Sequence, residues 1–187
     1  MIKASDIAKG TFILINNQPH VCVEREYVNP GKGSAFVRLK LKNIKTGAVL
    51  RQTNKVQDNM EDVSVEFHEV QFLYADSESY AFMDTKTYEQ FTISVEGEEE
   101  KRDFLKDGEN YQVVFWEQTP IDIRIPTKMV FTVTEAENAE RGDTVSGATK
   151  VVTCETGLKV KVPLFIKQGD KVLVNTETRE YQERVNG

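Results

Sequence analysis

The chain has 187 residues, of which 39% are hydrophobic and 29% are charged, a composition typical of a folded globular protein. No apolar run reaches the roughly 20 residues that a membrane-spanning helix needs, and the N-terminal residues lack the pattern of a secretory signal. We therefore expect a cytoplasmic protein with no membrane partner, in which Cys22 and Cys154 stay reduced and buried.

The formal net charge of −6 is distributed unevenly along the chain. Residues 1–63 hold 10 Lys and Arg against 6 Asp and Glu, residues 64–127 hold 5 against 15, and residues 128–187 hold 9 against 9. From Tyr27 to Gln57 there are seven basic residues and no acidic one. A polyanion could therefore dock on the first third of the chain. A solvated basic strand face beside an acidic domain explains the same numbers, so both interpretations stay open.

Residues 1–63 read as short strands and tight turns, which suit a small barrel. Two strand-like runs in residues 11–28 are separated by the turn-forming cluster Asn16-Asn17-Gln18-Pro19. From Phe36 to Lys42, apolar residues alternate with three basic ones, Arg38, Lys40 and Lys42. Period-two alternation predicts a strand with one face in the core and one basic face.

The segment Pro30-Gly31-Lys32-Gly33 predicts the tip of a hairpin between strands at residues 22–28 and 34–41. The proline fixes its own φ, and both glycines allow positive φ without a steric cost. Seven strand residues at about 3.3 Å each carry the tip roughly 20 Å from the barrel. Lys32 then stands at the end of a rod thin enough to enter a confined space. The alternative is an ordinary solvent-exposed turn lysine.

Residues 64–127 predict five strands with one short helix between the third and the fourth, the order of an oligonucleotide-binding (OB) barrel. The helix is expected within residues 96–109, with Phe104 and Leu105 as its apolar anchors. The last third of the chain predicts five more strands. The sequence thus predicts an all-β fold of three small barrels, with domains at 1–63, 64–127 and 128–187.

No arrangement of residues predicts catalysis, a metal site or a bound cofactor. His20 and His68 are the only histidines; His68 falls within a predicted strand and His20 in the loop before one, so both are expected to be structural. The loop around Lys32 lacks the spacing of a phosphate-binding P-loop, in which the lysine precedes Ser or Thr and then a helix. Here Gly33 and a strand follow the lysine, so nucleotide binding is rejected.

Three segments together resemble bacterial elongation factor P, and the resemblance covers essentially the whole chain. Residues 29–47, "NPGKGSAFVRLKLKNIKTG", resemble the family's lysine-bearing loop and the strands after it. Residues 66–90, "EFHEVQFLYADSESYAFMDTKTYEQ", resemble the opening of its second domain, and residues 141–185 resemble its third. The resemblance implies an SH3-like or KOW-like barrel followed by two OB barrels, in an elongated shape like that of tRNA.

The resemblance also implies a monomeric translation factor rather than an enzyme. Such a factor binds the ribosome beside peptidyl-tRNA, with mRNA in the exit site as a possible further contact, and relieves stalling at consecutive prolines. By the match of motif, Lys32 is the functional lysine that a lysine-modifying enzyme lengthens, and Pro30, Gly31 and Gly33 shape its loop. The candidates for RNA binding are basic strand residues and two groups in the third barrel: Arg38, Lys40, Lys42, Arg141, Gly142, Asp143, Thr144, Tyr181 and Arg184.

Two alternatives remain beside this interpretation. A factor-P-like branch of the same family generally lacks the lysine within Pro-Gly-x-Gly, so Lys32 favours the elongation factor branch. A general single-stranded nucleic-acid binder would use the two OB barrels, and it needs aromatic stacking residues on a basic barrel face. The excess of acidic residues in residues 64–127 disfavours that second class.

Overall fold

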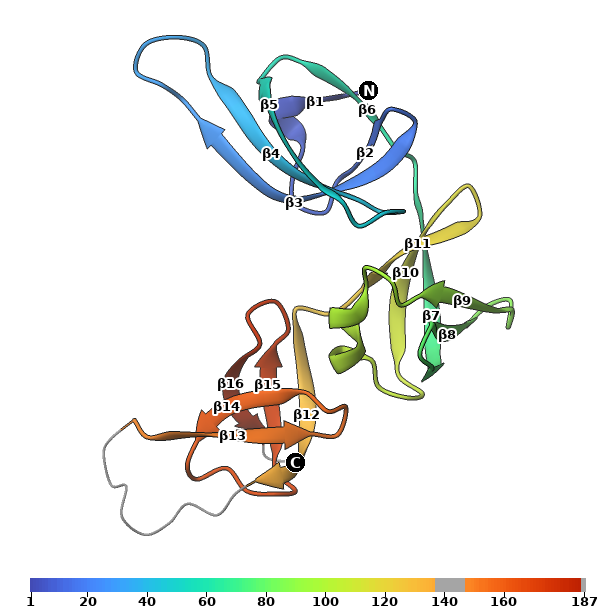
Figure 1. The fold of residues 1–187 in the computed structure, drawn as a ribbon, viewed down its shortest axis with the longest axis vertical. Helices are drawn as coiled ribbons and strands as arrows, with labels where there is room; N and C mark the ends of the chain where they lie inside the picture. The colour runs from blue at the N-terminus through green and yellow to red at the C-terminus, as the bar shows by residue number, and fades with distance from the viewer. Residues whose placement is uncertain (137–146, 186–187) are drawn as a thin grey trace. The chain divides into compact units, whose positions relative to one another are not determined.

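The computed structural model describes residues 1–136 and 147–185, which form three curled β-sheets and two short 3-10 helices (Figure 1). The predicted all-β, three-domain fold is confirmed. The domain limits and the elongated shape stay predictions. Within the described residues, no helix combines the length and the apolar character that crossing a membrane requires.

The first sheet has six antiparallel strands in the order β1-β6-β2-β3-β4-β5. Its elements are β1 Ile2–Lys3, the 3-10 helix η1 Ala4–Asp6, β2 Phe12–Ile15, β3 Gln18–Val28, β4 Phe36–Asn43, β5 Val49–Lys55 and β6 Asn59–Asp62. Asn16 and Asn17 both take positive φ, 51° and 61°, as a two-residue hairpin turn requires. Gln18 and Pro19 pair with β2 instead of belonging to the turn, which corrects their prediction.

Alternation along β4 places its side chains as predicted. Val37, Leu39 and Leu41 are fully buried in the first core, while the basic residues between them face outward. His20 was expected in a loop, and this is wrong. It lies within β3 and is buried, with its Nδ1 2.9 Å from the Gln18 carbonyl oxygen, because the turn before it is only two residues long.

The second sheet has five strands in the order β11-β10-β7-β8-β9. They are β7 Glu66–Ala75, β8 Ser79–Asp84, β9 Gln90–Ser94, β10 Asn110–Trp116 and β11 Thr119–Arg124. The expected helix is confirmed in its place between β9 and β10 as the 3-10 helix η2, Glu99–Phe104. Its anchors Phe104 and Leu105 are each only 5% exposed.

The third sheet has five antiparallel strands in the order β14-β13-β12-β15-β16. They are β12 Lys128–Ala136, β13 Thr149–Cys154, β14 Lys159–Pro163, β15 Lys171–Asn175 and β16 Glu180–Val185. Phe104 of η2 belongs to the same buried cluster as the core residues of this sheet, and its ring meets that of Phe131 edge-on at 6.3 Å. A residue of the preceding barrel thus completes the third core.

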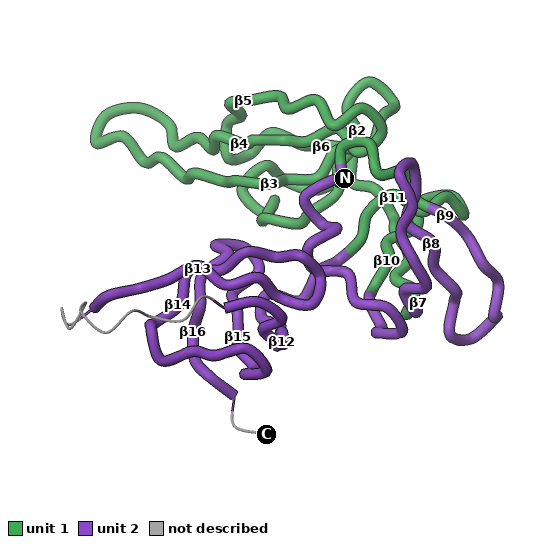
Figure 2. Tube along the Cα trace, turned by 60° about the horizontal axis from the view of Figure 1, so that its bottom comes forward, with its two compact units in different colours: residues 1–69, 93–97, 112–123 green, residues 70–92, 98–111, 124–187 purple. Residues whose placement is uncertain are grey.

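The chain divides into two compact units, coloured separately in Figure 2. Unit 1 is residues 1–69, 93–97 and 112–123, and unit 2 is residues 70–92, 98–111 and 124–187. In unit 1, Phe12 and Val21 of the first sheet form one buried cluster with Val114 and Ile121 of β10 and β11. In unit 2, Phe104 makes the equivalent apolar connection to the third sheet.

Candidate nucleic-acid interface

A long hairpin carries the predicted functional lysine. Strands β3 and β4 pair from His20 with Asn43 to Val28 with Phe36, so the predicted pairing is confirmed. Residues 29–35 form the loop at the far end of the hairpin (Figure 1). Gly33 takes a φ of 108°, whereas Gly31 does not take a positive φ, so only one of the two glycines uses the freedom predicted for both.

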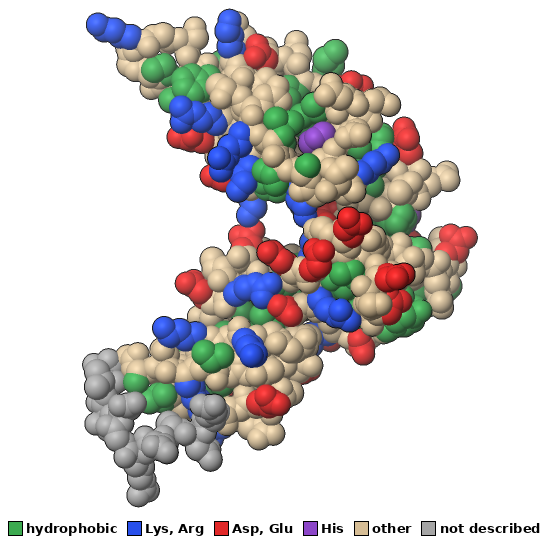
Figure 3. Space-filling model, viewed as in Figure 1, with side chains coloured by type: hydrophobic (Ala, Val, Ile, Leu, Met, Phe, Trp, Pro, Cys, Tyr) green, Lys and Arg blue, Asp and Glu red, His purple; other side chains and the backbone are tan. Residues whose placement is uncertain are grey.

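Lys32 is exposed at this loop. Within residues 1–136 and 147–185 it makes no hydrogen bond, ion pair or ring contact. Figure 3 shows a basic side chain at the far end of the hairpin, clear of other side chains. An ammonium group is a compact, strongly hydrated charge with three donors, and here all three are available to a partner.

The outer face of the hairpin is defined here by six side chains, Glu24, Glu26, Arg38, Lys40, Arg51 and Lys55. The register places Glu26 opposite Arg38 and Glu24 opposite Lys40. Arg38 Nη1 lies 3.2 Å from Glu26 Oε2, and Lys40 Nζ lies 3.6 Å from Glu24 Oε2. Figure 3 shows basic and acidic side chains side by side in this part of the molecule. The face predicted to be basic thus also carries two carboxylates.

Strand β5 extends the outer face. Arg51 lies opposite Lys40 and Lys55 lies opposite Phe36. Arg51 has no ion-pair partner among the described residues, so it leaves the face with a net positive charge. Lys42, the third predicted candidate on β4, donates instead to the carbonyl oxygen of Gly97 at 2.8 Å, which gives it a structural contact within unit 1.

The opposite side of the hairpin carries two residues that the sequence analysis did not select. Tyr27 is 51% exposed, and the Arg25 guanidinium lies 5.9 Å from the centre of its ring. Arg25 also donates to the Ser5 carbonyl oxygen at 2.8 Å. The alternation Glu24-Arg25-Glu26-Tyr27 was the available signal, since neighbouring strand residues point to opposite faces. An exposed tyrosine this close to the tip can stack on a base or a sugar.

Only two of the six candidates in the third barrel lie within the described residues. Arg141, Gly142, Asp143 and Thr144 lie outside the described residues. Tyr181 is partly buried against the third core, which leaves only part of its ring accessible. Arg184 is exposed, with its guanidinium 5.6 Å from the Phe165 ring and 3.9 Å from Asp170 Oδ2. Tyr181 and Arg184 belong to unit 2 and the hairpin to unit 1.

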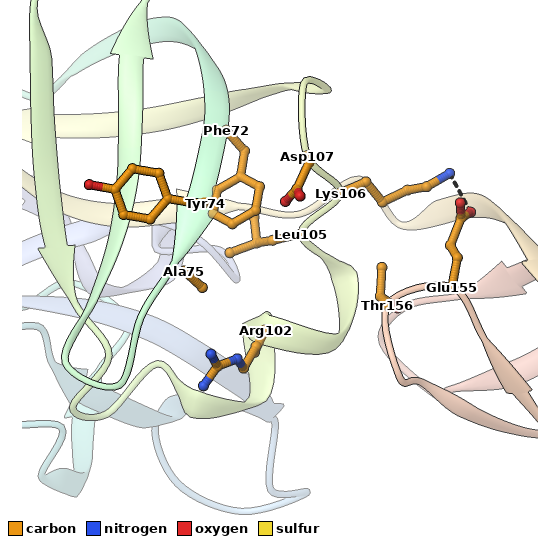
Figure 4. A pocket seen from close by; sticks show the side chains of 9 residues that line it. All are labelled: Phe72, Tyr74, Ala75, Arg102, Leu105, Lys106, Asp107, Glu155 and Thr156. Carbon is orange, nitrogen blue, oxygen red and sulfur yellow. Dashed lines mark ion pairs between the residues drawn. The ribbon is translucent and has the colours of Figure 1, made fainter.

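Within unit 2, η2 and the residues that follow it contact the third barrel. These contacts, called the seam here, hold the two parts of unit 2 together. Lys106 Nζ lies 2.8 Å from Glu155 Oε1 (Figure 4). It also donates to the Val130 carbonyl oxygen at 3.1 Å. Arg179 Nη1 lies 2.7 Å from Asp103 Oδ2, and its guanidinium is 5.0 Å from the Phe104 ring. Thr156 donates to the Asp103 carbonyl oxygen at 2.6 Å.

The seam lowers the pKa of one carboxylate, that of Glu155. Burial alone would raise the pKa of Glu155, but hydrogen bonds from Lys106 and from the Thr132 N–H outweigh it and lower the pKa overall. A cavity of about 400 Å³ opens beside these groups, lined by the Tyr74, Arg102 and Asp107 side chains among others (Figure 4). None of the described side chains that line this cavity has a buried polar atom without a hydrogen-bond partner.

The remaining potentially reactive side chains, His68, Cys22 and Cys154, are packed against other parts of the fold. The His68 ring lies against Phe115, tilted by 33° with ring centres 4.4 Å apart, and its Nε2 lies 3.3 Å from Glu66 Oε2. Burial raises the pKa of Cys22, and it raises the pKa of Cys154 to about 11, so both thiols stay protonated at neutral pH. Among the described residues, no group of three or more His, Cys, Asp or Glu could hold a metal ion.

Comparison with known families matches all three parts of the chain. The description "Elongation factor P (EF-P) KOW-like domain" fits residues 3–60, "Elongation factor P (EF-P) OB domain" fits residues 56–123, and "Elongation factor P, C-terminal" fits residues 129–184. The elongation factor P of Treponema denticola is 54% identical over 186 residues, with 100% of both chains covered. The chain belongs to the elongation factor P family.

Other members of the elongation factor P family match over nearly the same length. The elongation factor P of Borrelia duttonii is 48% identical, covering 98% of this chain and 97% of its own. Among solved structures, the eukaryotic translation initiation factor 5A from Methanococcus jannaschii aligns with a TM-score of 0.50 at 20% identity, over 66% of this chain and 91% of its own. That likeness concerns the fold alone. Membership of the family makes the chain a translation elongation factor.

Proposed function

We propose that this factor binds the ribosome next to peptidyl-tRNA and stimulates peptide-bond formation at consecutive prolines through Lys32. The observation that carries the proposal is the placement of Lys32, exposed and without a partner in the described residues, at the end of the hairpin of β3 and β4. A lysine held in this way contributes nothing visible to the fold, so its use lies in contact with another molecule. In the part of the chain that the structure describes, no acidic or basic side chain contacts it.

The proposed mechanism is positioning. Proline is a secondary amine with a fixed φ, so it reacts slowly and restricts the growing chain. Holding the end of peptidyl-tRNA in a reactive geometry removes part of the entropic barrier, which amounts to several kcal/mol in favourable cases. The Lys32 ammonium group contacts phosphates and 2′-hydroxyls at the tRNA end, and a modifying enzyme that lengthens the side chain extends its reach.

Further contacts are assigned to the rest of the chain. Arg38 and Lys40 dock on the tRNA backbone, since Arg and Lys recognise phosphate by charge and hydrogen bonds. Lys42 contributes less than its neighbours, because its ammonium group is engaged with Gly97. Residues 141–144 contact mRNA in the exit site or the small subunit, with Arg184 and the accessible part of Tyr181 as weaker RNA contacts. The factor acts as a monomer, and no step needs a catalytic group of its own.

The test is a reconstituted translation reaction with protein purified from its own host, so that any modification is kept. Synthesis of a reporter with a Pro-Pro-Pro segment is timed against one without it, and the mass of the hairpin peptide is measured in parallel. We expect selective acceleration of the proline reporter and a hairpin peptide heavier than its sequence. Equal rates with and without the factor, together with tight binding to free single-stranded RNA, would instead favour a general nucleic-acid binder.

A further inference from the structure

The outer face of the hairpin holds two carboxylates in front of the cations that are proposed to dock on tRNA. We infer that Glu24 and Glu26 are specificity-determining residues, which weaken binding to free RNA and so reserve Arg38 and Lys40 for the ribosome-bound complex. This inference rests on the proposed function, because it concerns the same RNA contact.

The hairpin register fixes this arrangement. Each carboxylate lies directly across from one cation, Glu26 from Arg38 and Glu24 from Lys40, and directly opposed side chains on one face interact. The four side chains lie on the face of the hairpin opposite the buried Val37, Leu39 and Leu41, and all four are accessible to a partner.

The ion pairs are weak enough to be exchanged. Side chains of the Arg38–Glu26 pair are 57% and 58% exposed, and exposed pairs contribute little to stability because water screens them. A phosphate that approaches Arg38 must displace or tolerate Glu26, and the same holds for Lys40 and Glu24. Each carboxylate also repels the phosphate directly. The two ion pairs therefore affect the affinity for RNA more than the stability of the fold.

The cost of this repulsion differs between the two kinds of RNA. A factor held on the ribosome by other contacts presents its hairpin at a high effective concentration, so the exchange is tolerated. Free RNA meets the outer face with few other contacts, and the repulsion then decides the outcome. Specificity is a difference between two affinities, and an unfavourable contact with the wrong partner is a common way to produce it. Arg51 has no ion-pair partner in the described residues, so the face keeps some attraction for RNA.

The experiment compares the wild type with the double variant Glu24→Gln/Glu26→Gln. The control is Glu61→Gln/Glu89→Gln, which changes the net charge equally at two exposed glutamates that are not part of this face. Binding to deacylated tRNA is titrated across a series of salt concentrations. For Glu24→Gln/Glu26→Gln we expect roughly tenfold tighter binding than for the wild type at low salt. The slope of the logarithm of the binding constant against the logarithm of the salt concentration should be steeper by about one for each carboxylate removed. Equal affinities of the two variants would overturn the inference.

A second arm separates this inference from the proposed function. The proline reporter is timed with and without excess deacylated tRNA as a competitor. We expect the competitor to inhibit the Glu24→Gln/Glu26→Gln protein strongly, and the wild type and control only slightly; equal inhibition of all three would contradict the inference. Failure of the proposed function looks different, since the wild type would then not accelerate the reporter even without competitor.

Discussion

The hairpin and the seam use the same kinds of side chains for different purposes. On the hairpin, Arg38 and Glu26 form an exposed pair 3.2 Å apart, supported by one ring, that of Phe36. At the seam, Arg179 reaches Asp103 at 2.7 Å, donates to the Glu100 carbonyl oxygen at 3.2 Å and covers the buried Phe104 ring. The Arg179 pair, which also binds a backbone acceptor and covers a buried ring, stabilises the fold, whereas the more exposed Arg38–Glu26 pair stays available to a partner.

Removal of the apolar anchor Phe104 is expected to weaken the seam most. Phe104→Ala deletes a ring that is 5% exposed within the third core, and we expect the free energy of unfolding of unit 2 to fall by about 3 kcal/mol or more. Denaturant unfolding measures the loss.

Thiol alkylation tests whether the loss is confined to the third core. Cys154 shares the buried cluster with Phe104, whereas Cys22 lies in the first core. In the Phe104→Ala protein, alkylation should therefore be faster than in the wild type at Cys154 alone. Equal acceleration at both thiols would show that the two cores are not independent.

The polar side of the seam is expected to matter less. Arg179→Ala removes an ion pair, a hydrogen bond and a cation–π contact, and we expect a loss of about 1–2 kcal/mol in the free energy of unfolding. Arg184→Ala is the matched control, because the Arg184–Asp170 ion pair is long at 3.9 Å and the Phe165 ring beside the guanidinium is exposed. Losses of equal size in the two variants would remove the distinction between seam pairs and surface pairs.

The hairpin tip offers a matched pair of glycines. Gly33→Ala forces a side chain onto a φ of 108°, with an expected cost of about 1 kcal/mol. Gly31→Ala meets no atom within 4 Å and has no positive φ, so it should leave stability unchanged. Thermal unfolding of both variants tests the loop geometry. A destabilised Gly31→Ala protein with an unaffected Gly33→Ala protein would mean that the loop has a different conformation.

Acid should loosen the seam through Glu155. Its folded pKa lies below the ordinary 4.5, so the unfolded chain binds the proton more readily. The stabilisation is therefore complete above about pH 4.5 and is lost as the pH falls through the folded pKa. Because the group is partly exposed, we expect less than about 1 kcal/mol. Glu155→Gln should unfold with a weaker pH dependence than the wild type between pH 5 and 3; identical dependence would contradict this.

Local pattern predicted the hairpin well. The glycines and proline around Lys32, and the alternation that follows, predicted both the tip and the buried face of β4. The glutamates opposite Arg38 and Lys40 were readable from the same register. The bulge near Cys22 and the burial of His20 were not, because both depend on how many residues the preceding turn takes.

Contacts between residues far apart in the sequence could not be predicted either. Phe104 was expected to anchor its own helix, and nothing in its neighbourhood indicated that it completes the core of the next barrel. The Arg179 contact likewise joins residues 76 positions apart from a turn that looks ordinary in sequence. Such contacts arise from the meeting of two folded parts, so periodicity and turn chemistry within one segment do not report them.

The most direct measurement compares two neighbouring tip variants, Lys32→Ala and Gly31→Ala, in the proline reporter reaction and in thermal unfolding. Among the described residues, the Lys32 side chain has no partner and a Cβ at position 31 meets no atom within 4 Å, so we expect both proteins to melt within the wild-type range. We expect Lys32→Ala to lose the acceleration of the Pro-Pro-Pro reporter, whereas Gly31→Ala retains most of it. A Lys32→Ala protein that accelerates the reporter like the wild type, or that melts far below it, would contradict the account.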